Sequence, residues 1–330
     1  MTGQLALNEI LGESRKRVNR VLVAGELASH KVEIPITIAS GKEPRPTLVV
    51  TAGMHATEYA ANMTAYKLAQ EVDPNDIQGS LIIAPLVNRY GFEAFSRREN
   101  PVDHVNLNRI FPGNPNGSLS YQMAYVLFKE VISKADCYID LHGGEIGESL
   151  APFIVNYKTN DKVVDEKAES LIGAFGFEYV WQPANALDTT NSAEQSESGF
   201  AITQATKVGI PSFIAEAGEE GRLEQKHVQL LYEGVLNVMR AMGMTKGKPK
   251  ATNLRFCREA SYLLAGKSGM LQLAVKAGEL VKSGQKLAEI LSFEGNVLES
   301  VRAPFDAIVV SERTFAVVKS TDLLFLILRL

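Results

Sequence analysis

Cysteine is scarce in this chain, which has two, Cys137 and Cys257, among 330 residues. Two thiols cannot form the disulfide framework on which many small secreted proteins depend. Both lie among apolar neighbours, so we expect buried free thiols in a reducing compartment. The N-terminus also lacks the charged-then-apolar layout of a signal peptide. These features together predict a cytoplasmic protein.

Long apolar runs and an excess of positive charge are missing as well. The longest apolar run, Leu323 to Leu328, is far too short to span a bilayer and predicts a strand. The chain has 34 Lys and Arg against 38 Asp and Glu, a net charge of −4, which leaves no electrostatic footprint for nucleic acid. We therefore expect a soluble protein with neither membrane nor nucleic acid as a partner.

Short apolar runs alternate with segments of helical spacing up to residue 242. The runs lie at 47–53, 80–88, 137–142 and 212–218, and the helical segments begin near residues 58, 120, 160 and 223. Such alternation requires crossover connections and predicts an α/β fold with a mostly parallel or mixed sheet flanked by helices. A further strand over 32–38 is expected at a sheet edge because it contains Pro35.

The pattern changes after a stretch rich in glycine, lysine and proline at 243–253. Beyond it, short apolar runs are separated by turns, and no helical spacing is convincing, which predicts a small all-β, barrel-like module. A chain of 330 residues is also too long for one ordinary core. We therefore expect two domains, at 1–248 and 249–330.

Three short segments each carry an ionisable side chain at the point where an apolar run stops. The segments are GMHATEYA at 53–60, YIDLHGGE at 138–145 and SFIAEAGEEG at 212–221. They supply His55 with Glu58, then His142, then Glu216. Ligands bind at the carboxyl ends of strands in open α/β sheets. Two imidazoles and a carboxylate suit Zn²⁺, which leaves its fourth position to water in catalytic sites, and the remaining carboxylate could act as a base.

Each of these residues has a simpler explanation when taken alone. The HxxE spacing could mark a helix start, with Glu58 favouring the helix dipole. His142 could be a satisfied histidine at a strand end, and Glu216 could form a salt bridge with an arginine. Their common position at strand–loop junctions favours the metal site. We expect Asp140, two residues before His142, to point to the opposite face and not to bind the ion.

A long segment with little periodicity, 89–118, contains several arginines. They are Arg89, Arg97, Arg98 and Arg109. An arginine near a zinc site can stabilise the oxyanion of a tetrahedral intermediate, and another can hold a substrate carboxylate. Composition does not assign these roles, and at least one of the four is expected to be an ordinary surface arginine.

Four segments together resemble the succinylglutamate desuccinylase/aspartoacylase family. They are GMHATE, NLNRIFPG, DLHGG and EAGEEG, in that order. That family belongs to the zinc carboxypeptidase-like superfamily, and the C-terminal β module also looks like the β domain of the family. The resemblance implies one zinc ion per chain, held by His55, Glu58 and His142, with Glu216 as the general base.

The resemblance also implies roles in the long segment. Asn108 and Arg109 match the pair that holds the substrate carboxylate in the family. Arg98 matches the arginine that polarises the carbonyl, and Arg97 is the nearby alternative. The family usually has aspartate where this chain has Asn106. This difference removes a negative charge close to Asn108 and Arg109.

The function implied is a zinc-dependent amidohydrolase that cleaves the amide of small N-acyl amino acids or related N-acylated amines. The expected partner is a small N-acylated substrate with a carboxylate, and the oligomeric state, a homo-oligomer included, stays open. One alternative is a metallocarboxypeptidase acting on small peptides. Another is a catalytically silent protein that binds zinc or another ligand.

The C-terminal module also looks like a lipoyl or biotinyl carrier barrel. Such carriers display a lysine at a hairpin tip, but the segment SFEGNVLES at 292–300 has none. We therefore expect a structural or gating module that covers the mouth of the site and restricts entry to small substrates.

Overall fold

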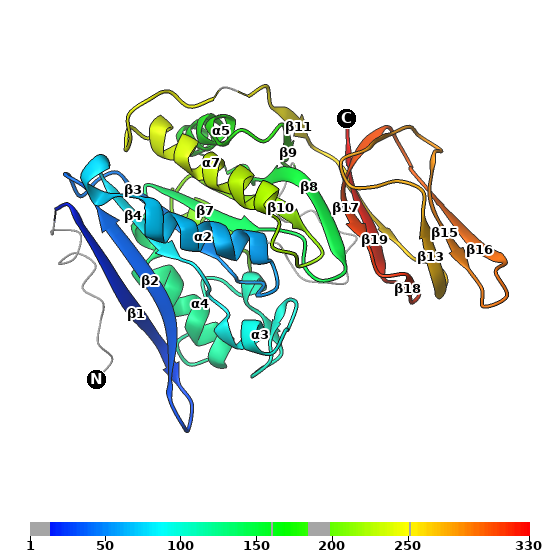
Figure 1. Ribbon diagram of the computed structural model, residues 1–330, viewed down its shortest axis with the longest axis horizontal. Helices are drawn as coiled ribbons and strands as arrows, with labels where there is room; N and C mark the ends of the chain where they lie inside the picture. Colours follow the sequence, from blue (N-terminus) through cyan, green and yellow to red (C-terminus); the bar gives the residue numbers. More distant parts are fainter. Residues whose placement is uncertain (1–13, 160, 184–198, 251) are drawn as a thin grey trace.

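The computed structural model describes residues 14–159, 161–183, 199–250 and 252–330. Figure 1 shows a larger part, in which helices cover a twisted sheet, and a smaller part made of strands alone at the C-terminal end. The described helices include none that is both long and apolar enough to cross a membrane. The two parts seen in Figure 1 confirm the predicted α/β fold with a C-terminal β module.

The larger part is built on a mixed sheet. Its strands, in spatial order, are β1 (Lys16–Glu26), β2 (Lys31–Ser40), β4 (Ser80–Ala84), β3 (Thr47–Ala52), β7 (Cys137–His142), β10 (Ser212–Glu219) and β8 (Glu148–Val155). The four strands β4, β3, β7 and β10 run parallel, and β8 is antiparallel to β10. Every residue of β3, β4 and β7 is buried, as expected for parallel strands covered on both faces.

Helices cover both faces of this sheet (Figure 1). One apolar core joins it to α2 (Tyr59–Glu71), α5 (Lys162–Phe175) and α7 (Gln225–Ala241), and a second core joins it to α4 (Leu119–Glu130) and α6 (Ala201–Lys207). The connections carry α3 (Arg89–Glu93) and the short 3₁₀ turns η1 (Pro74–Asp76), η2 (Leu107–Arg109) and η3 (Ile132–Lys134), with the strand pair β5 (Glu99–Asn100) and β6 (Val105–Asn106). The segment 89–118 is thus mostly irregular, as predicted.

The edge position predicted for the strand at 32–38 is wrong. This strand, β2, pairs with β1 along its whole length and also with β4. The pairing with β4 covers only Thr37 to Ser40, so at Pro35 the strand is paired on the β1 side alone. A residue without a backbone N–H is tolerated there, because no ladder hydrogen bond is needed on the other side.

The C-terminal part consists of two small sheets packed on an apolar core. One contains β12 (Ala260–Leu264), β19 (Leu323–Arg329), β17 (Ala307–Arg313) and β14 (Leu280–Val281), and the other β16 (Val297–Arg302), β15 (Lys286–Leu291), β13 (Gly269–Leu273) and β18 (Val317–Val318). The first sheet continues the large one, because β17 pairs with β8. A second link is the parallel pairing of β11 (Arg255–Cys257) with β9 (Tyr179–Trp181). The domain boundary at residue 248 stays a prediction.

Candidate active site

One cavity of about 140 Å³ lies at the carboxyl ends of β3 and β7 and beside the middle of β10, which continues beyond Glu216 to Glu219. Its lining includes all seven residues to which the sequence and the family resemblance together assign a site role: His55, Glu58, Arg98, Asn108, Arg109, His142 and Glu216. Arg97 is not among the lining residues. Tyr262, Ser311, Leu323 and Leu326 of the C-terminal part also line the cavity, where we expect this module from the sequence; its gating role stays a prediction.

The parallel strands bring distant residues together at this cavity. His142 is the last residue of β7 and lies in register with Glu216 on β10. Gly143 follows, and a Cβ atom there would lie 2.5 Å from the Ala217 carbonyl oxygen, so only glycine permits this close approach. His55 lies in the turn after β3, and Glu58 is the N-cap residue of α2.

His55, Glu58 and His142 form a compact buried group. The two oxygens of Glu58 divide between the histidines: Oε1 lies 2.9 Å from Nδ1 of His55, and Oε2 lies 2.9 Å from Nδ1 of His142. One ligand atom from each residue lies within 4.8 Å of the others. The Glu58 side chain makes no capping hydrogen bond to α2, so its orientation serves the histidines and not the helix start.

The charges around this group favour a cation. Burial would raise the pKa of Glu58, but His142 and His55 outweigh burial and lower its pKa to about 2. Burial would lower the pKa of His142, but Glu58 and Asp140 raise this pKa well above its usual value. The buried carboxylates of Glu58 and Asp140 thus stabilise a positive charge placed between them. Two imidazole nitrogens and a carboxylate also match the donor set of a zinc or similar ion, which would replace the proton.

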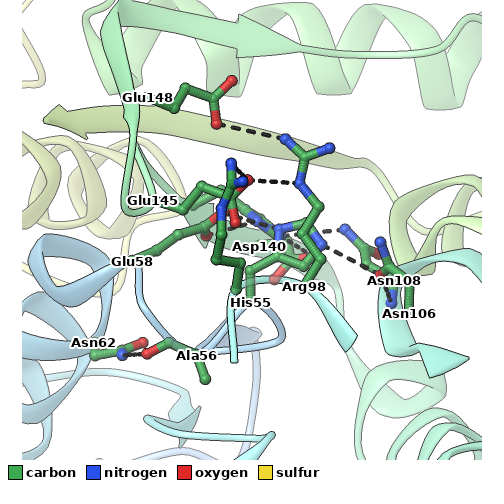
Figure 2. Close-up of polar contacts among 12 residues, drawn as sticks. His55, Ala56, Glu58, Asn62, Arg98, Asn106, Asn108, Asp140, Glu145 and Glu148 are labelled. Atoms are coloured by element: carbon green, nitrogen blue, oxygen red, sulfur yellow. Dashed lines mark hydrogen bonds and ion pairs between the residues drawn. The ribbon is translucent and has the colours of Figure 1, made fainter. Parts of the chain in front are cut away.

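The residues beyond the three ligating candidates fix the imidazoles. Asp140 Oδ2 lies 3.0 Å from Nε2 of His142 and, in Figure 2, sits beside the site. The expectation that Asp140 points to the opposite face is therefore wrong, because residues two apart on a strand share a face. This contact leaves Nδ1 of His142 as the nitrogen directed at Glu58. Asn106, on the other side, places Oδ1 3.3 Å from Nε2 of His55.

A second group with ligand-like spacing consists of Glu219, Glu224 and His227. Lys226 already bridges it, with Nζ 2.7 Å from Glu219 and 3.0 Å from Glu224. The positive charge that a metal would bring is thus supplied by the chain itself, and we assign no site there.

Glu216 keeps part of its surface open to the cavity while protein surrounds the rest. Burial is the main cause that raises its pKa to about 8; Glu58, Glu148 and Asp140 add to the rise, and His142 opposes it. A carboxyl group whose pKa lies near neutrality can both accept and donate a proton, which is what a general acid/base requires.

Two arginines, Arg97 and Arg98, lie against the buried carboxylate of Glu145, and Figure 2 shows Glu145 beside Arg98. Glu145, whose side chain is 1% exposed, accepts from Arg97 Nη2 at 2.8 Å and lies 2.7 Å from Nε of Arg98. Arg98 also lies 3.6 Å from Glu148, and its side chain reaches the cavity, whereas Arg97 lies over the ring of Phe315. Nothing in the sequence singles out Glu145 beyond its place directly after the paired glycines Gly143 and Gly144.

Glu145→Gln tests whether this carboxylate positions Arg98. The amide keeps the shape but loses the charge that holds two guanidinium groups, so we expect kcat to fall on the order of 10- to 100-fold with KM little changed. Metal content should stay at the wild-type level, because Glu145 does not contact the three candidate ligands. Unchanged kcat, or loss of the metal, would contradict the positioning role.

Asn108 and Arg109 lie in η2 on the other side of the cavity. Asn108 is buried, with Nδ2 3.2 Å from Nε2 of His142, and its Oδ1 accepts from the Ala201 backbone. The Arg109 guanidinium lies over the ring of Phe200 at 4.2 Å. The close contact of Gly199 with the Arg109 backbone, where a Cβ atom would clash, keeps Phe200 beside it.

Comparison with known proteins agrees with this arrangement. The model of the succinylglutamate desuccinylase/aspartoacylase catalytic domain matches residues 44–242. The chain therefore belongs to the succinylglutamate desuccinylase/aspartoacylase family. Membership makes it an amide-cleaving hydrolase of the deacylase class.

The similarity to known relatives extends over nearly the full chain. It is 27% identical over 304 residues to N-alpha-acetyl-L-2,4-diaminobutyric acid deacetylase from Halomonas elongata, covering 90% of this chain and 86% of that protein. A succinylglutamate desuccinylase from Silicibacter sp. TM1040 is 25% identical with a TM-score of 0.85, and a succinylglutamate desuccinylase/aspartoacylase from Rhodobacter sphaeroides is 24% identical with a TM-score of 0.84. Both structures cover 97% of this chain and 96% of their own. The C-terminal β part is thus shared with these structures.

Proposed function

We propose that the protein is a zinc-dependent amidohydrolase that removes the acyl group from small N-acyl amino acids. The observation that carries this proposal is that the buried group of His55, Glu58 and His142 lines one small cavity together with Glu216 and Arg98. The deacetylase from Halomonas elongata, named for an N-acetyl amino acid, supports the substrate class.

His55, Glu58 and His142 would hold one zinc ion per chain. Such an ion supplies Lewis-acid chemistry and makes a bound water more acidic. Glu216 would take the proton from the water that attacks the carbonyl carbon and then donate it to the departing nitrogen. A carboxyl group that titrates near neutrality suits both directions of this transfer.

Arg98 is proposed to stabilise the negative charge that develops on the carbonyl oxygen. We expect Arg98→Ala to lower kcat on the order of 10²- to 10³-fold, because a preorganised donor at an oxyanion has an effect of that size. Arg97→Ala is the matched control: Arg97 binds the same Glu145 but does not line the cavity, so its loss should be much less severe. Steady-state kinetics of both variants would decide between them, and equal losses would contradict the assignment.

Arg109 with Asn108 is proposed to bind the substrate carboxylate. Arg109→Ala should raise KM by roughly tenfold or more, since a charged hydrogen bond to a carboxylate is lost. The same variant should hydrolyse an N-acetyl amino acid amide, which lacks the carboxylate, about as well as the wild-type enzyme does. An unchanged KM for the carboxylate substrate would show that the anchor lies elsewhere.

The decisive experiment is a hydrolysis screen with zinc-loaded protein of measured metal content. Release of free amine from N-acyl amino acids would support the proposal. Cleavage of dipeptides alone would favour a carboxypeptidase. Stoichiometric zinc with no hydrolysis across the panel would favour a silent binding protein. We expect hydrolysis of N-acyl amino acids, because Tyr262 and Leu323 of the C-terminal part wall the cavity and leave room for small substrates.

A further inference from the structure

The cavity has a polar end and an apolar wall. The polar end holds the candidate metal ligands, Glu216 and the arginines. The wall is formed mainly by Phe153, Val155, Trp181, Ile214, Tyr262 and Leu326. The proposed chemistry uses the polar end alone, so the wall must have another role.

The wall begins directly beside the proposed base. Glu216 on β10 lies in register with Phe153 on β8, and Ile214 lies in register with Val155. Residues two apart on a strand share a face, so all four side chains stand on the same side of the sheet. The next strand continues this surface, because Trp181 on β9 pairs with Val155. An apolar group attached near the reacting amide would therefore contact this wall.

The wall also reaches the proposed carboxylate anchor. The guanidinium of Arg109 lies over Phe200, whose ring stacks on Tyr157 at 5.9 Å between centroids. Trp181 meets Tyr262 edge to face at 5.9 Å, so a strand of the C-terminal part closes the wall. Aromatic rings in these arrangements offer a large, rigid apolar surface.

We propose that the substrate is an N-acyl α-amino acid whose side chain is uncharged and apolar or aromatic. This inference rests on the proposed function. One α-carbon carries the amide nitrogen, the carboxylate and the side chain. With the amide at Glu216 and the carboxylate at Arg109, the side chain is directed to the wall that joins those two residues.

The charges of the cavity argue against a second charged group on the substrate. The guanidinium groups among the described lining residues are Arg98 and Arg109, and Arg98 is already engaged by Glu145 and Glu148. Glu148 in turn accepts from the Ser311 hydroxyl at 2.8 Å. A carboxylate or an ammonium placed on the aromatic wall would lose its hydration without gaining an ionic partner among the described residues of the wall, which is costly.

Binding can be measured without turnover in zinc-loaded Glu216→Gln. The chain contains one tryptophan, Trp181, and it lines the cavity, so its fluorescence reports directly on the wall. We expect N-acetyl-L-leucine to shift this emission and to bind at least about tenfold more tightly than N-acetyl-L-aspartate or N-acetyl-L-2,4-diaminobutyrate, a ratio that an apolar pocket can reach. Tighter binding of either charged compound would overturn the inference.

Tyr262→Lys, made in the same Glu216→Gln background, tests the wall itself. The new cation should reverse the preference, weakening N-acetyl-L-leucine and strengthening N-acetyl-L-aspartate by about tenfold each. Leu264→Lys is the matched control, because it adds the same charge on the same strand at a position that is 46% exposed and outside the cavity. Equal effects of the two lysines would contradict the proposed wall.

Hydrolysis by the wild-type enzyme separates the two proposals. Turnover that favours charged N-acyl amino acids would overturn the apolar preference and leave the amidohydrolase assignment intact. Tight binding of N-acetyl-L-leucine with no hydrolysis of any panel member would contradict the assigned reaction, while the preference of the cavity would stand.

Discussion

Glu216→Gln should abolish nearly all turnover while the protein keeps its metal. We expect kcat to fall on the order of 10²- to 10⁴-fold, the range for losing a general acid/base. The amide has the shape of the carboxyl group but can neither accept nor return the proton. The measurement is kcat on an N-acyl amino acid, with metal content determined on the same sample.

The stability of this variant gives an independent check. Because burial raises the pKa of Glu216 to about 8, its ionised form is disfavoured where it lies. A neutral amide in its place should leave the thermal midpoint unchanged or slightly higher at neutral pH. Glu219→Gln is the control on the same strand, outside the cavity, and should retain activity. Turnover of Glu216→Gln within tenfold of wild type would remove this residue from the mechanism.

The positions of the proposed ligands could be predicted because they follow from the geometry of parallel strands. Buried apolar runs identify β3, β7 and β10, and parallel strands end at one edge of the sheet. His142 and Glu216, 74 positions apart by their numbers, are brought into register by that rule. The motif resemblance then added Arg98, Asn108 and Arg109, whose irregular segment has no periodicity from which a position could be derived.

Other features could not be predicted because they depend on pairing between distant segments. Strand β1, for which we expected no strand, pairs along the whole of β2 and gives Pro35 a partner on that side. The link between β8 and β17 brings the C-terminal strands to the cavity, and no local pattern encodes that pairing. Asp140 was a different error, since its spacing from His142 already indicated a shared face.

His142→Ala should remove the metal and the activity together. The side chain supplies one of three candidate ligand atoms, and two ligands seldom retain zinc through dialysis. The substitution also leaves Glu58 and Asp140 buried without the imidazole between them, and we expect it to destabilise the fold by about 3–5 kcal/mol, as when one partner of a buried pair is removed.

Metal content after dialysis, kcat and denaturant unfolding of His142→Ala measure these three effects separately. His30→Ala is a suitable control, because His30 is exposed and contacts Ser29 and Tyr90 far from the cavity, so all three values should match wild type. In the wild-type protein, chelation should abolish turnover and added zinc should restore it, which His142→Ala should not permit. A variant that retains one equivalent of zinc would show that His142 is not a ligand, and Asp140 would then be the buried group to test in its place.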